Sequence, residues 1–289
     1  MTTTSGFTGP LNHVYSGDCL DFLPTLPANR VDLVVTSPPY NVGLDYGYDL
    51  DDRRPWLDYY AWLEEVLAQL YRVLKPGGVL ALNLPKEVKL PKADLAVLGR
   101  RVEKIATQAE AICARLGYLP RESIVWAKGP EGLPIAPGHK TGSDNNIYLR
   151  SACEMILLYS KERYYIDNGT GRRGKKDVPW EDETKDVWWI PPRSRRPGQP
   201  PAFPLEIPTR LINLFTCLRP DKDFVPLVLD PFAGQGTTGV AARQLGRDFI
   251  GIELNPVWAA QANAMLNLIT PNEIKGDLAY ANAVASLAA

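Results

Sequence analysis

The chain has 289 residues, of which 45% are hydrophobic and 22% are charged, and its formal net charge is -1. These values describe a globular protein with enough apolar residues for one large core or two modest ones. They exclude recognition of nucleic acid through a strongly positive field of the whole molecule, so any such partner must meet a local basic patch.

Three absences narrow the class of protein further. The four cysteines have no CxxC spacing and the only histidines are His13 and His139, so we expect neither a metal site nor a disulfide framework. No apolar run approaches the roughly 20 residues that a transmembrane helix needs. The stretch MTTTSGFTGP at residues 1–10 lacks the charged start and apolar core of a signal peptide. We therefore expect a cytoplasmic protein with no membrane segment.

Residues 12–159 predict strands and helices in alternation, the pattern of an α/β sheet protein. VDLVVT at 31–36 is a continuous β-branched run, typical of a strand buried on both faces. Leucines and valines recur at helical spacing over 56–74, and Lys75-Pro76-Gly77-Gly78 ends that helix. The predicted strands of this part are 31–36, 78–84, 123–127 and 153–159, and its second predicted helix is 94–116.

The composition changes between 128 and 204, where glycine, proline and charged residues dominate. Within 161–176 six basic residues stand against two acidic ones, so a positive patch exists despite the neutral average. Such a run is either a contact surface for an anionic partner or a solvated loop.

The α/β pattern returns after 207. Pro208 suits the start of a helix and Gly246 the end of the next one. The predicted helices are 208–218, 236–246 and 256–269, and the predicted strands are 226–230 and 248–254. A βαβα unit therefore forms the last part of the predicted sheet.

A glycine motif lies between the strand at 226–230 and the helix that follows it. Residues 234–239 satisfy GxGxxG, and Glu253 ends the next strand, a pattern that suits a nucleotide cofactor whose ribose the acidic residue holds. Asp230 precedes the turn and would repel a pyrophosphate. It would attract a cationic amino group and a sulfonium, which favours S-adenosylmethionine over a dinucleotide. The alternative is a tight turn with incidental glycines.

A second motif, Thr36-Ser37-Pro38-Pro39-Tyr40, ends the strand at 31–36. Because the carboxyl ends of parallel strands open on one crevice, we expect this motif to face the Gly234 turn. The two prolines fix the backbone and remove two N–H donors, leaving acceptors beside a hydroxyl and an aromatic ring. That arrangement suits an amino group with two hydrogens to donate, and the alternative is a rigid turn.

Together these motifs resemble those of the DNA amino-methyltransferases, the family that methylates the exocyclic amine of cytosine or adenine and often partners a restriction enzyme. The family's Phe-x-Gly-x-Gly cofactor motif matches 232–236, its acidic ribose residue matches Glu253, and its Asp/Ser-Pro-Pro-Tyr motif matches 37–40. Here the catalytic motif precedes the cofactor motif, which is the permuted order of the family's β class. The resemblance covers nearly the whole chain, with further similarities at Gly17-Asp18-Cys19, Lys75-Pro76-Gly77-Gly78 and Pro201-Ala202-Phe203-Pro204.

The resemblance implies the Rossmann-like fold of S-adenosylmethionine-dependent methyltransferases, circularly permuted. This fold is a mixed, mostly parallel sheet with helices on both faces, here with a small loop-rich target-recognition region. The implied division of the chain is a catalytic half at 11–160, a target-recognition insertion at 161–200 with an alternative start near 129, a cofactor-binding half at 201–272 and a tail at 273–289.

The resemblance also implies three sets of site residues and no metal. The implied catalytic residues are Ser37, Pro38, Pro39 and Tyr40. The implied cofactor-binding residues are Asp18, Cys19, Thr36, Phe203, Pro204, Asp230, Phe232, Ala233, Gly234, Gln235, Gly236, Thr237, Thr238, Glu253 and Leu254. The implied DNA-binding residues are Arg172, Arg173, Lys175, Lys176, Arg193, Arg195 and Arg196.

The implied reaction is a direct in-line displacement on a base flipped out of double-stranded DNA at a cost of a few kcal/mol. The target amine would donate to the Ser37 hydroxyl and the Pro38 carbonyl, and Tyr40 would stack on the base. None of the four cysteines follows a proline, as the nucleophile of cytosine-C5 enzymes does, so we set that reaction aside. Trp188 and Trp189 are either core residues or intercalating ones, and 140–146 is either a DNA-facing loop or a surface turn.

The target base is predicted to be cytosine, methylated at N4, because serine heads the motif where adenine-N6 enzymes usually carry Asp or Asn. Ala202-Phe203-Pro204 resembles the cytosine type, although Gln199-Pro200 stands where a histidine-proline pair is common. An adenine-N6 enzyme on the same scaffold is the alternative, and a DNA-binding module without catalysis is a distant one. A dehydrogenase is the weakest alternative, because no second nucleotide-binding half follows the glycine turn.

The implied partners are double-stranded DNA, a restriction endonuclease that acts separately, and a second copy of the chain. The implied location is the cytoplasm of a prokaryote, at the nucleoid.

Overall fold

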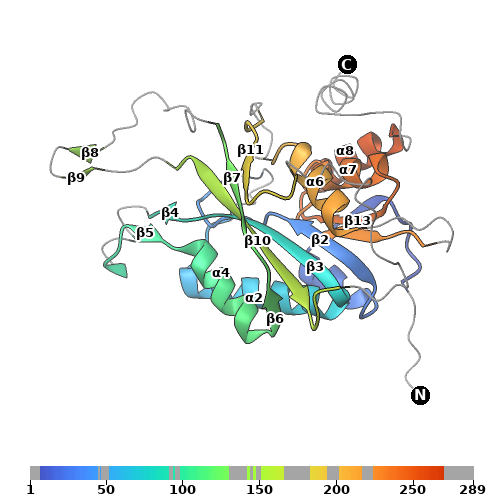
Figure 1. The fold of residues 1–289 in the computed structure, drawn as a ribbon, viewed down its shortest axis with the longest axis horizontal. Helices are drawn as coiled ribbons and strands as arrows, with labels where there is room; N and C mark the ends of the chain where they lie inside the picture. The colour runs from blue at the N-terminus through green and yellow to red at the C-terminus, as the bar shows by residue number, and fades with distance from the viewer. Residues whose placement is uncertain are drawn as a thin grey trace.

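The computed structural model describes residues 7–44, 46, 52–90, 94, 98–129, 142–143, 146–147, 151–165, 183–193, 202–216 and 224–269. Within these ranges nine strands form one sheet in the order β1-β13-β12-β2-β3-β10-β7-β11, with β6 paired to β10 (Figure 1). Neighbours from β1 to β3 are parallel, β10 is antiparallel to β3, β6 and β7, and β11 is parallel to β7. The predicted mixed, mostly parallel sheet is therefore confirmed.

The sheet combines both halves of the chain. Its strands are β1 (His13–Ser16), β2 (Val31–Thr36), β3 (Leu74–Pro85), β6 (Tyr118–Pro120), β7 (Ile124–Ala127), β10 (Cys153–Lys161), β11 (Val187–Trp189), β12 (Leu227–Asp230) and β13 (Asp248–Glu253). Two short antiparallel pairs lie outside it, β4 (Val88–Lys89) with β5 (Val102–Glu103), and β8 (Gly142–Ser143) with β9 (Asn146–Ile147).

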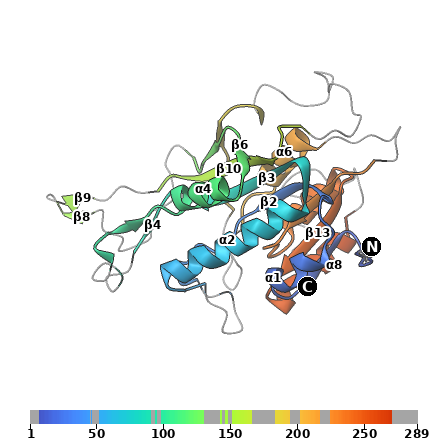
Figure 2. The ribbon, with the colours of Figure 1, turned by 90° about the horizontal axis from the view of Figure 1, so that it is seen from below.

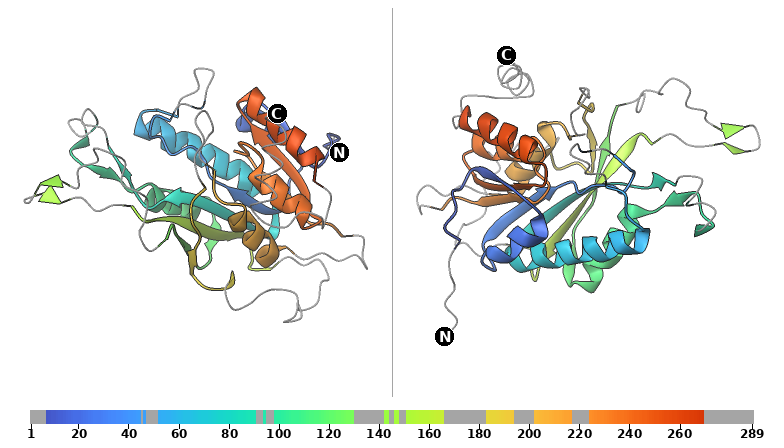
Figure 3. Two further views of the ribbon diagram at one scale, coloured as in Figure 1. Left: turned by 90° about the horizontal axis from the view of Figure 1, so that it is seen from above. Right: turned by 180° about the vertical axis from the view of Figure 1, so that it is seen from behind.

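Helices cover both faces of the sheet (Figures 2 and 3). One face packs against α1 (Cys19–Phe22), the 3-10 turn η1 (Leu23–Thr25), α2 (Trp56–Val73) and α4 (Ile105–Arg115). The other packs against α6 (Glu206–Phe215), α7 (Thr237–Gln244) and α8 (Pro256–Asn267). Successive residues of β2 serve opposite faces: Leu33 and Val35 pack on the α6–α8 side and Val34 on the α2 side. This alternation explains why all six residues of β2 are apolar or buried.

Two boundaries differ from the predictions. The helix predicted over 94–116 is interrupted. Residues 94 and 98 are helical, but Gly99 takes a left-handed φ of 64°, Val102–Glu103 form β5, and α4 begins at Ile105. The strand predicted over 78–84 begins at Leu74, which pairs with Val31. The register between β2 and β3 shifts after this pair, so that Leu33 pairs with Val79. The other predicted strands and helices are present, with ends that coincide with the prediction or differ from it by up to three residues.

The segment predicted as a target-recognition insertion is partly built into the sheet. β11 lies inside 161–200 and pairs with β7, and Trp188 on it is 1% exposed, whereas Trp189 is 64% exposed. Trp188 is therefore a core residue. No helix in the ranges described above is long and apolar enough to cross a membrane.

Candidate active site

A pocket of about 400 Å³ opens at the carboxyl ends of β1, β2, β12 and β13, the edge where α/β sheets bind their ligands. It brings together the two sequence motifs, although nearly 200 residues separate Ser37 from Asp230. The predicted site residues that line it are Asp18, Cys19, Ser37, Pro38, Pro39, Tyr40, Arg193, Phe203, Asp230, Phe232, Ala233, Gly234, Gln235, Thr237, Thr238, Glu253 and Leu254.

The remaining predicted residues fall into two groups. Thr36, Pro204 and Gly236 are not among the residues that line the pocket, and Thr36 contacts it only by donating to Asp230. Six residues predicted to bind DNA lie outside the described residues, namely Arg172, Arg173, Lys175, Lys176, Arg195 and Arg196.

The glycine turn between β12 and α7 needs left-handed backbone at two positions. Gly234 has a φ of 51° and Gly236 a φ of 80°. A Cβ on Gly236 would lie 3.0 Å from the Cβ of Ala262, so α8 packs directly on this turn. A Cβ on Gly234 would meet no atom of the chain within 4 Å, because this glycine borders open space. One glycine therefore serves packing, and the other keeps the backbone approachable from the pocket.

Glu253 joins the end of β13 to the glycine turn. Its carboxylate accepts from the backbone N–H of Gly234 at 2.8 Å and from that of Asn255 at 2.9 Å. Burial raises the pKa of Glu253, and these two hydrogen bonds oppose the shift. The parallel pairing of Ser16 with Glu253 places Asp18, the N-cap of α1, at the same edge.

Asp230 is 2% exposed and accepts three hydrogen bonds from the chain. The donors are the Thr36 hydroxyl at 2.8 Å, the Thr238 hydroxyl at 2.7 Å and the Phe232 N–H at 3.1 Å. Burial raises its pKa to about 6, against the opposing effect of these donors. A carboxylate has about four acceptor positions, and these donors occupy three of them.

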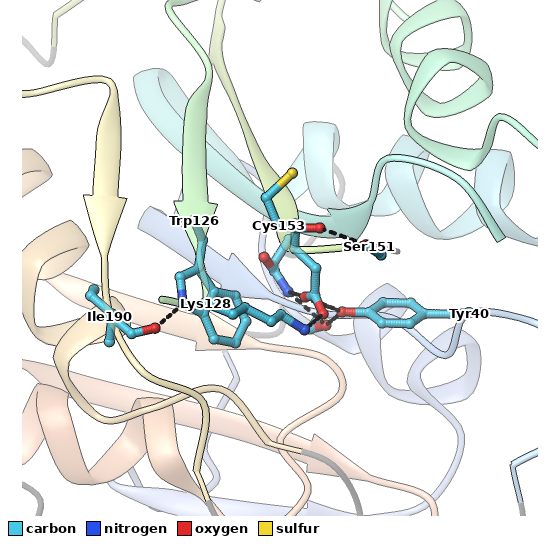
Figure 4. A network of polar contacts seen from close by, with 9 residues as sticks. Tyr40, Trp126, Lys128, Ser151, Cys153 and Ile190 are labelled. Carbon is cyan, nitrogen blue, oxygen red and sulfur yellow. Dashed lines mark hydrogen bonds and ion pairs between the residues drawn. The ribbon is translucent and has the colours of Figure 1, made fainter. Parts of the chain in front are cut away.

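Ser37 and Tyr40 meet in a polar cluster at the floor of the pocket, part of which Figure 4 shows. Their hydroxyl oxygens lie 2.6 Å apart, and the Tyr40 hydroxyl donates to Glu154 at 3.1 Å. The Tyr59 hydroxyl donates to the Pro39 carbonyl at 2.8 Å and so fixes the Pro-Pro turn from beneath. Burial and the Glu154 charge raise the pKa of Tyr40 well above its usual range, so this hydroxyl stays protonated.

Three polar residues of this cluster are absent from the predicted site. Glu154 on β10 accepts from Asn83 on β3 at 2.7 Å and pairs with Lys128, whose Nζ lies 4.7 Å from the Trp126 ring centroid. The Asn83 amide oxygen is buried and has no partner among the described residues. All of these residues line the pocket. Their sequence signal is one polar residue inside an otherwise apolar strand, GVLALNL for Asn83 and CEMILLY for Glu154.

The chain after Tyr40 contributes Leu44 and Tyr46 to the lining of the pocket, and side-chain hydrogen bonds fix its backbone. The Asn41 side chain donates to the Arg54 carbonyl at 3.0 Å and accepts from the Arg54 N–H at 2.6 Å. Asp52, which is 6% exposed, accepts from the N–H groups of Val42, Gly43 and Leu44. At the far end the Asn255 amide donates to the Tyr46 carbonyl at 2.8 Å. Tyr46 thus links the stretch that follows the Ser-Pro-Pro-Tyr motif to Asn255, the N-cap of α8.

The described part of the chain contains no group of three His, Cys, Asp or Glu side chains that could hold a metal ion. Its pocket instead combines carboxylates beside an open glycine turn with hydroxyl and amide groups on the neighbouring strands. The fold and the pocket thus define an α/β protein with a candidate ligand site at the carboxyl ends of its strands, beside the glycine turn.

A family model described as DNA methylase, of the N6/N4 type, matches residues 31–264, from β2 to α8. The chain belongs to this family of DNA methylases. The matched residues include both motifs that line the pocket.

Known relatives are of two kinds. The type II methyltransferase M.BglII of Bacillus subtilis is 29% identical over 266 residues, which are 89% of this chain and 69% of that protein. The DNA adenine methyltransferase YhdJ of Escherichia coli K12 is 30% identical over 247 residues, 84% of this chain and 78% of that protein.

Solved structures show the same arrangement. TTHA0409 of Thermus thermophilus, assigned as a DNA modification methylase and solved with S-adenosyl-L-methionine, is 28% identical with a TM-score of 0.60. The match covers 86% of this chain and 92% of that one. The cytosine-N4-specific PvuII DNA methyltransferase shares the fold, with a TM-score of 0.66 over 98% of this chain and 96% of that one at 18% identity.

Proposed function

We propose that this protein transfers a methyl group from S-adenosylmethionine to the N4 amine of a cytosine flipped out of double-stranded DNA at a specific sequence. The observation that carries the proposal is the position of Ser37, whose hydroxyl lies in the same pocket as the Gly234 turn. The family membership of the chain supports methylation of an exocyclic amine, and the serine favours cytosine as the base.

The residues present fit S-adenosylmethionine. Gly234 offers backbone that a ligand can approach without meeting a side chain. Glu253 would hold the ribose hydroxyls, and Asp230 would attract the cationic methionyl end, since one of its acceptor positions is unused. When bound, the cofactor supplies a methyl group on a sulfonium. Phe203, 9% exposed on the wall of the pocket, would cover that end.

The chain's own contribution to the chemistry is to position the amine. The exocyclic nitrogen of cytosine is a poor nucleophile because its lone pair is delocalised into the ring. Hydrogen bonds from the amine to the Ser37 hydroxyl and the Pro38 carbonyl would favour a pyramidal nitrogen with its lone pair directed at the methyl carbon. The Tyr40 hydroxyl is anchored on Glu154, so its ring can act as a stacking platform for the flipped base.

Adenine, methylated at N6, is the second candidate base. Its support is the similarity to YhdJ, which is named a DNA adenine methyltransferase. Against it stands Ser37, at a position where adenine enzymes of the family generally carry Asp or Asn. A serine hydroxyl is shorter than those side chains and can donate as well as accept.

DNA recognition is assigned to the region around 161–200. Arg193 lines the pocket and would meet phosphates beside the flipped nucleotide. The other basic residues proposed to bind DNA are Arg172, Arg173, Lys175, Lys176, Arg195 and Arg196. A separate restriction endonuclease of the same specificity and a homodimer are further expectations of the restriction-modification assignment.

The test is mass spectrometry of nucleosides from unmethylated genomic DNA incubated with the protein and isotopically labelled S-adenosylmethionine. Labelled N4-methyldeoxycytidine is the expected product. Labelled N6-methyldeoxyadenosine would show that the target base is adenine and would leave the proposed site unchanged. Genomic DNA without any labelled nucleoside would contradict the proposed activity. Genomic DNA is the substrate of choice because it samples nearly every short recognition sequence.

A further inference from the structure

The proposed reaction requires that the methylated amine lose a proton. As the N–C bond forms and the C–S bond breaks, the electron pair of the C–S bond stays on sulfur and the nitrogen becomes positively charged. Its remaining N–H groups are then strongly acidic. Ser37 alone cannot keep such a proton, because a neutral alcohol is a very weak base. A stronger acceptor must therefore lie within reach of Ser37 through hydrogen bonds.

Glu154 lies at the end of a short chain of hydroxyls that begins at Ser37. Ser37 Oγ is 2.6 Å from Tyr40 Oη, and Tyr40 Oη is 3.1 Å from Glu154 Oε2. Both distances lie within or close to the range of O–H···O hydrogen bonds. Figure 4 shows the Tyr40 hydroxyl directed at the carboxylate that also receives Lys128. Two proton hops thus connect Ser37 to a carboxylate.

The direction of these hydrogen bonds follows from counting hydrogens. The Tyr40 hydroxyl has one hydrogen, and it donates to Glu154. The hydrogen between Ser37 and Tyr40 must therefore come from Ser37, and Asn83 Nδ2 donates a second hydrogen to Tyr40 Oη at 2.9 Å. Ser37 Oγ accepts a long contact from Asn83 Nδ2 at 3.4 Å, and its other lone pair can accept from the target amine. The network thus makes Ser37 an acceptor, as removal of a proton requires.

Two neighbours fix the position of the Glu154 carboxylate. Lys128 Nζ forms an ion pair with Oε1, and Asn83 Nδ2 donates to Oε2 at 2.7 Å. The two charged side chains are 11% and 12% exposed, so each would be costly to bury without the other. The Asn83 amide cannot be reversed, because its oxygen would then face the carboxylate. Glu154 is consequently held in a fixed position at the end of the hydroxyl chain, paired with a cation.

We propose that Glu154 is the terminal proton acceptor of methyl transfer, reached from the target amine through Ser37 and Tyr40. The inference rests on the proposed function. The amine proton passes to Ser37 Oγ, the Ser37 proton to Tyr40 Oη and the Tyr40 proton to Glu154, which ends as a neutral carboxylic acid. No other reactant is consumed. Lys128 and Asn83 are positioning residues for this acceptor.

The first test is Glu154→Gln, measured in single turnover with saturating cofactor and DNA. A glutamine oxygen can still accept from Tyr40 but cannot take up its proton. We expect methyl transfer to slow by roughly 10²- to 10⁴-fold, the usual contribution of general acid–base catalysis. Cofactor affinity by calorimetry and DNA affinity should stay within about twofold. The solvent deuterium isotope effect of the wild-type transfer step should disappear. A variant that retains the wild-type rate and isotope effect would overturn the proposal.

Tyr40→Phe is the second variant, and it remains informative if Glu154→Gln does not fold. It removes the middle hydroxyl and leaves the Lys128–Glu154 ion pair in place. The relay predicts a loss of rate and of isotope effect similar to that of Glu154→Gln. A wild-type rate for Tyr40→Phe would contradict the relay, whatever Glu154→Gln does.

The matched control is Glu103→Gln, on β5 outside the pocket. Glu103 is 2% exposed and also accepts from a tyrosine hydroxyl, that of Tyr60 at 2.8 Å, beside a cation, Arg100. Loss of this buried charge should lower stability and leave methyl transfer and its isotope effect unchanged. The two proposals fail separately: no methylated nucleoside from wild-type protein refutes the function, whereas a wild-type rate in either relay variant refutes the relay alone.

Discussion

The Thr36 hydroxyl donates to the Asp230 carboxylate at 2.8 Å across 194 positions of the chain. This bond joins the last residue of β2, which leads into the catalytic motif, to the last residue of β12, which leads into the glycine turn. The parallel pairing of β2 with β12 makes the contact possible. A change at Asp230 therefore reaches both the glycine turn and the Ser-Pro-Pro-Tyr motif.

Cofactor affinity should fall below pH 6 because of Asp230. Burial raises the pKa of this carboxyl to about 6, from an ordinary value near 3.9. A cationic cofactor favours the ionised form, so its affinity should be constant above pH 6 and weaken by up to about tenfold per unit below it. Calorimetric titration of S-adenosylmethionine between pH 5 and 8 measures this dependence.

Asp230→Asn separates this effect from that of Glu253, whose pKa burial also raises and which lines the same pocket. The variant should bind more weakly at pH 8 and lose the part of the pH dependence that Asp230 contributes. The same carboxyl acts on stability with the opposite sign. The folded protein keeps the Asp230 proton to a higher pH than the unfolded chain does. The stability that this proton contributes is complete below about pH 4 and is lost as the pH rises through 6. Asp230→Asn should therefore make the free energy of unfolding less dependent on pH across that window. An unchanged cofactor affinity at pH 8 would remove Asp230 from the site.

Gly234→Ala should separate cofactor binding from stability. The left-handed φ of 51° makes a side chain cost about 1–2 kcal/mol, and the added methyl group would enter open space beside the pocket. We expect S-adenosylmethionine affinity to fall at least about tenfold, which corresponds to a loss of about 1.4 kcal/mol of binding free energy. The control is Gly246→Ala, where φ is 70° at a position that does not line the pocket. Equal affinities in the two variants would mean that the glycine turn serves packing only.

The motifs of this site that are contiguous in the chain are predictable from sequence, and the residues that only strand pairing brings together are not. The strand at 31–36 and the turn at 234–239 are contiguous in the chain, so hydrophobic runs and glycine spacing identify them. Glu154 and Asn83 come together only because β10 pairs antiparallel with β3, setting Asn83 opposite Ile156. No spacing along the chain encodes that register, which side-chain packing across the sheet determines.

The misplaced helix start has a similar cause. Residues 94–116 have helical spacing, but the buried Glu103 carboxylate binds Tyr60 and Arg100, which favours the β4–β5 pair over another helical turn. Tertiary hydrogen bonds of this kind outweigh helix propensity, which differs by less than about 1 kcal/mol per ordinary residue.

Ser37→Ala should slow methyl transfer without loss of cofactor binding. The substitution removes the acceptor for the target amine and the hydroxyl 2.6 Å from Tyr40, while Asp230, Glu253 and the glycine turn are untouched. A loss of roughly 10²- to 10³-fold in single-turnover rate is expected for one hydrogen bond made to the reacting group. Rapid-quench assays with labelled cofactor measure the rate, and calorimetry measures affinity. Equal losses in rate and affinity would indicate misfolding instead of an amine contact.

Charge reversal at Arg172, Arg173, Lys175 and Lys176 should weaken DNA binding and reduce its salt dependence. Each basic residue that no longer neutralises a phosphate lowers the slope of log affinity against log salt by about 0.9, because fewer counterions are released. A reversal of Lys104 and Arg115 is the control, since both are more than half exposed on α4 or beside it and neither lines the pocket. Fluorescence anisotropy between 50 and 200 mM salt, about the range over which phosphate contacts dominate, gives both slopes. If the slope is the same in both reversals and in the wild-type protein, residues 161–176 are a solvated loop, and Arg193 at the pocket becomes the first basic residue to test for phosphate contact.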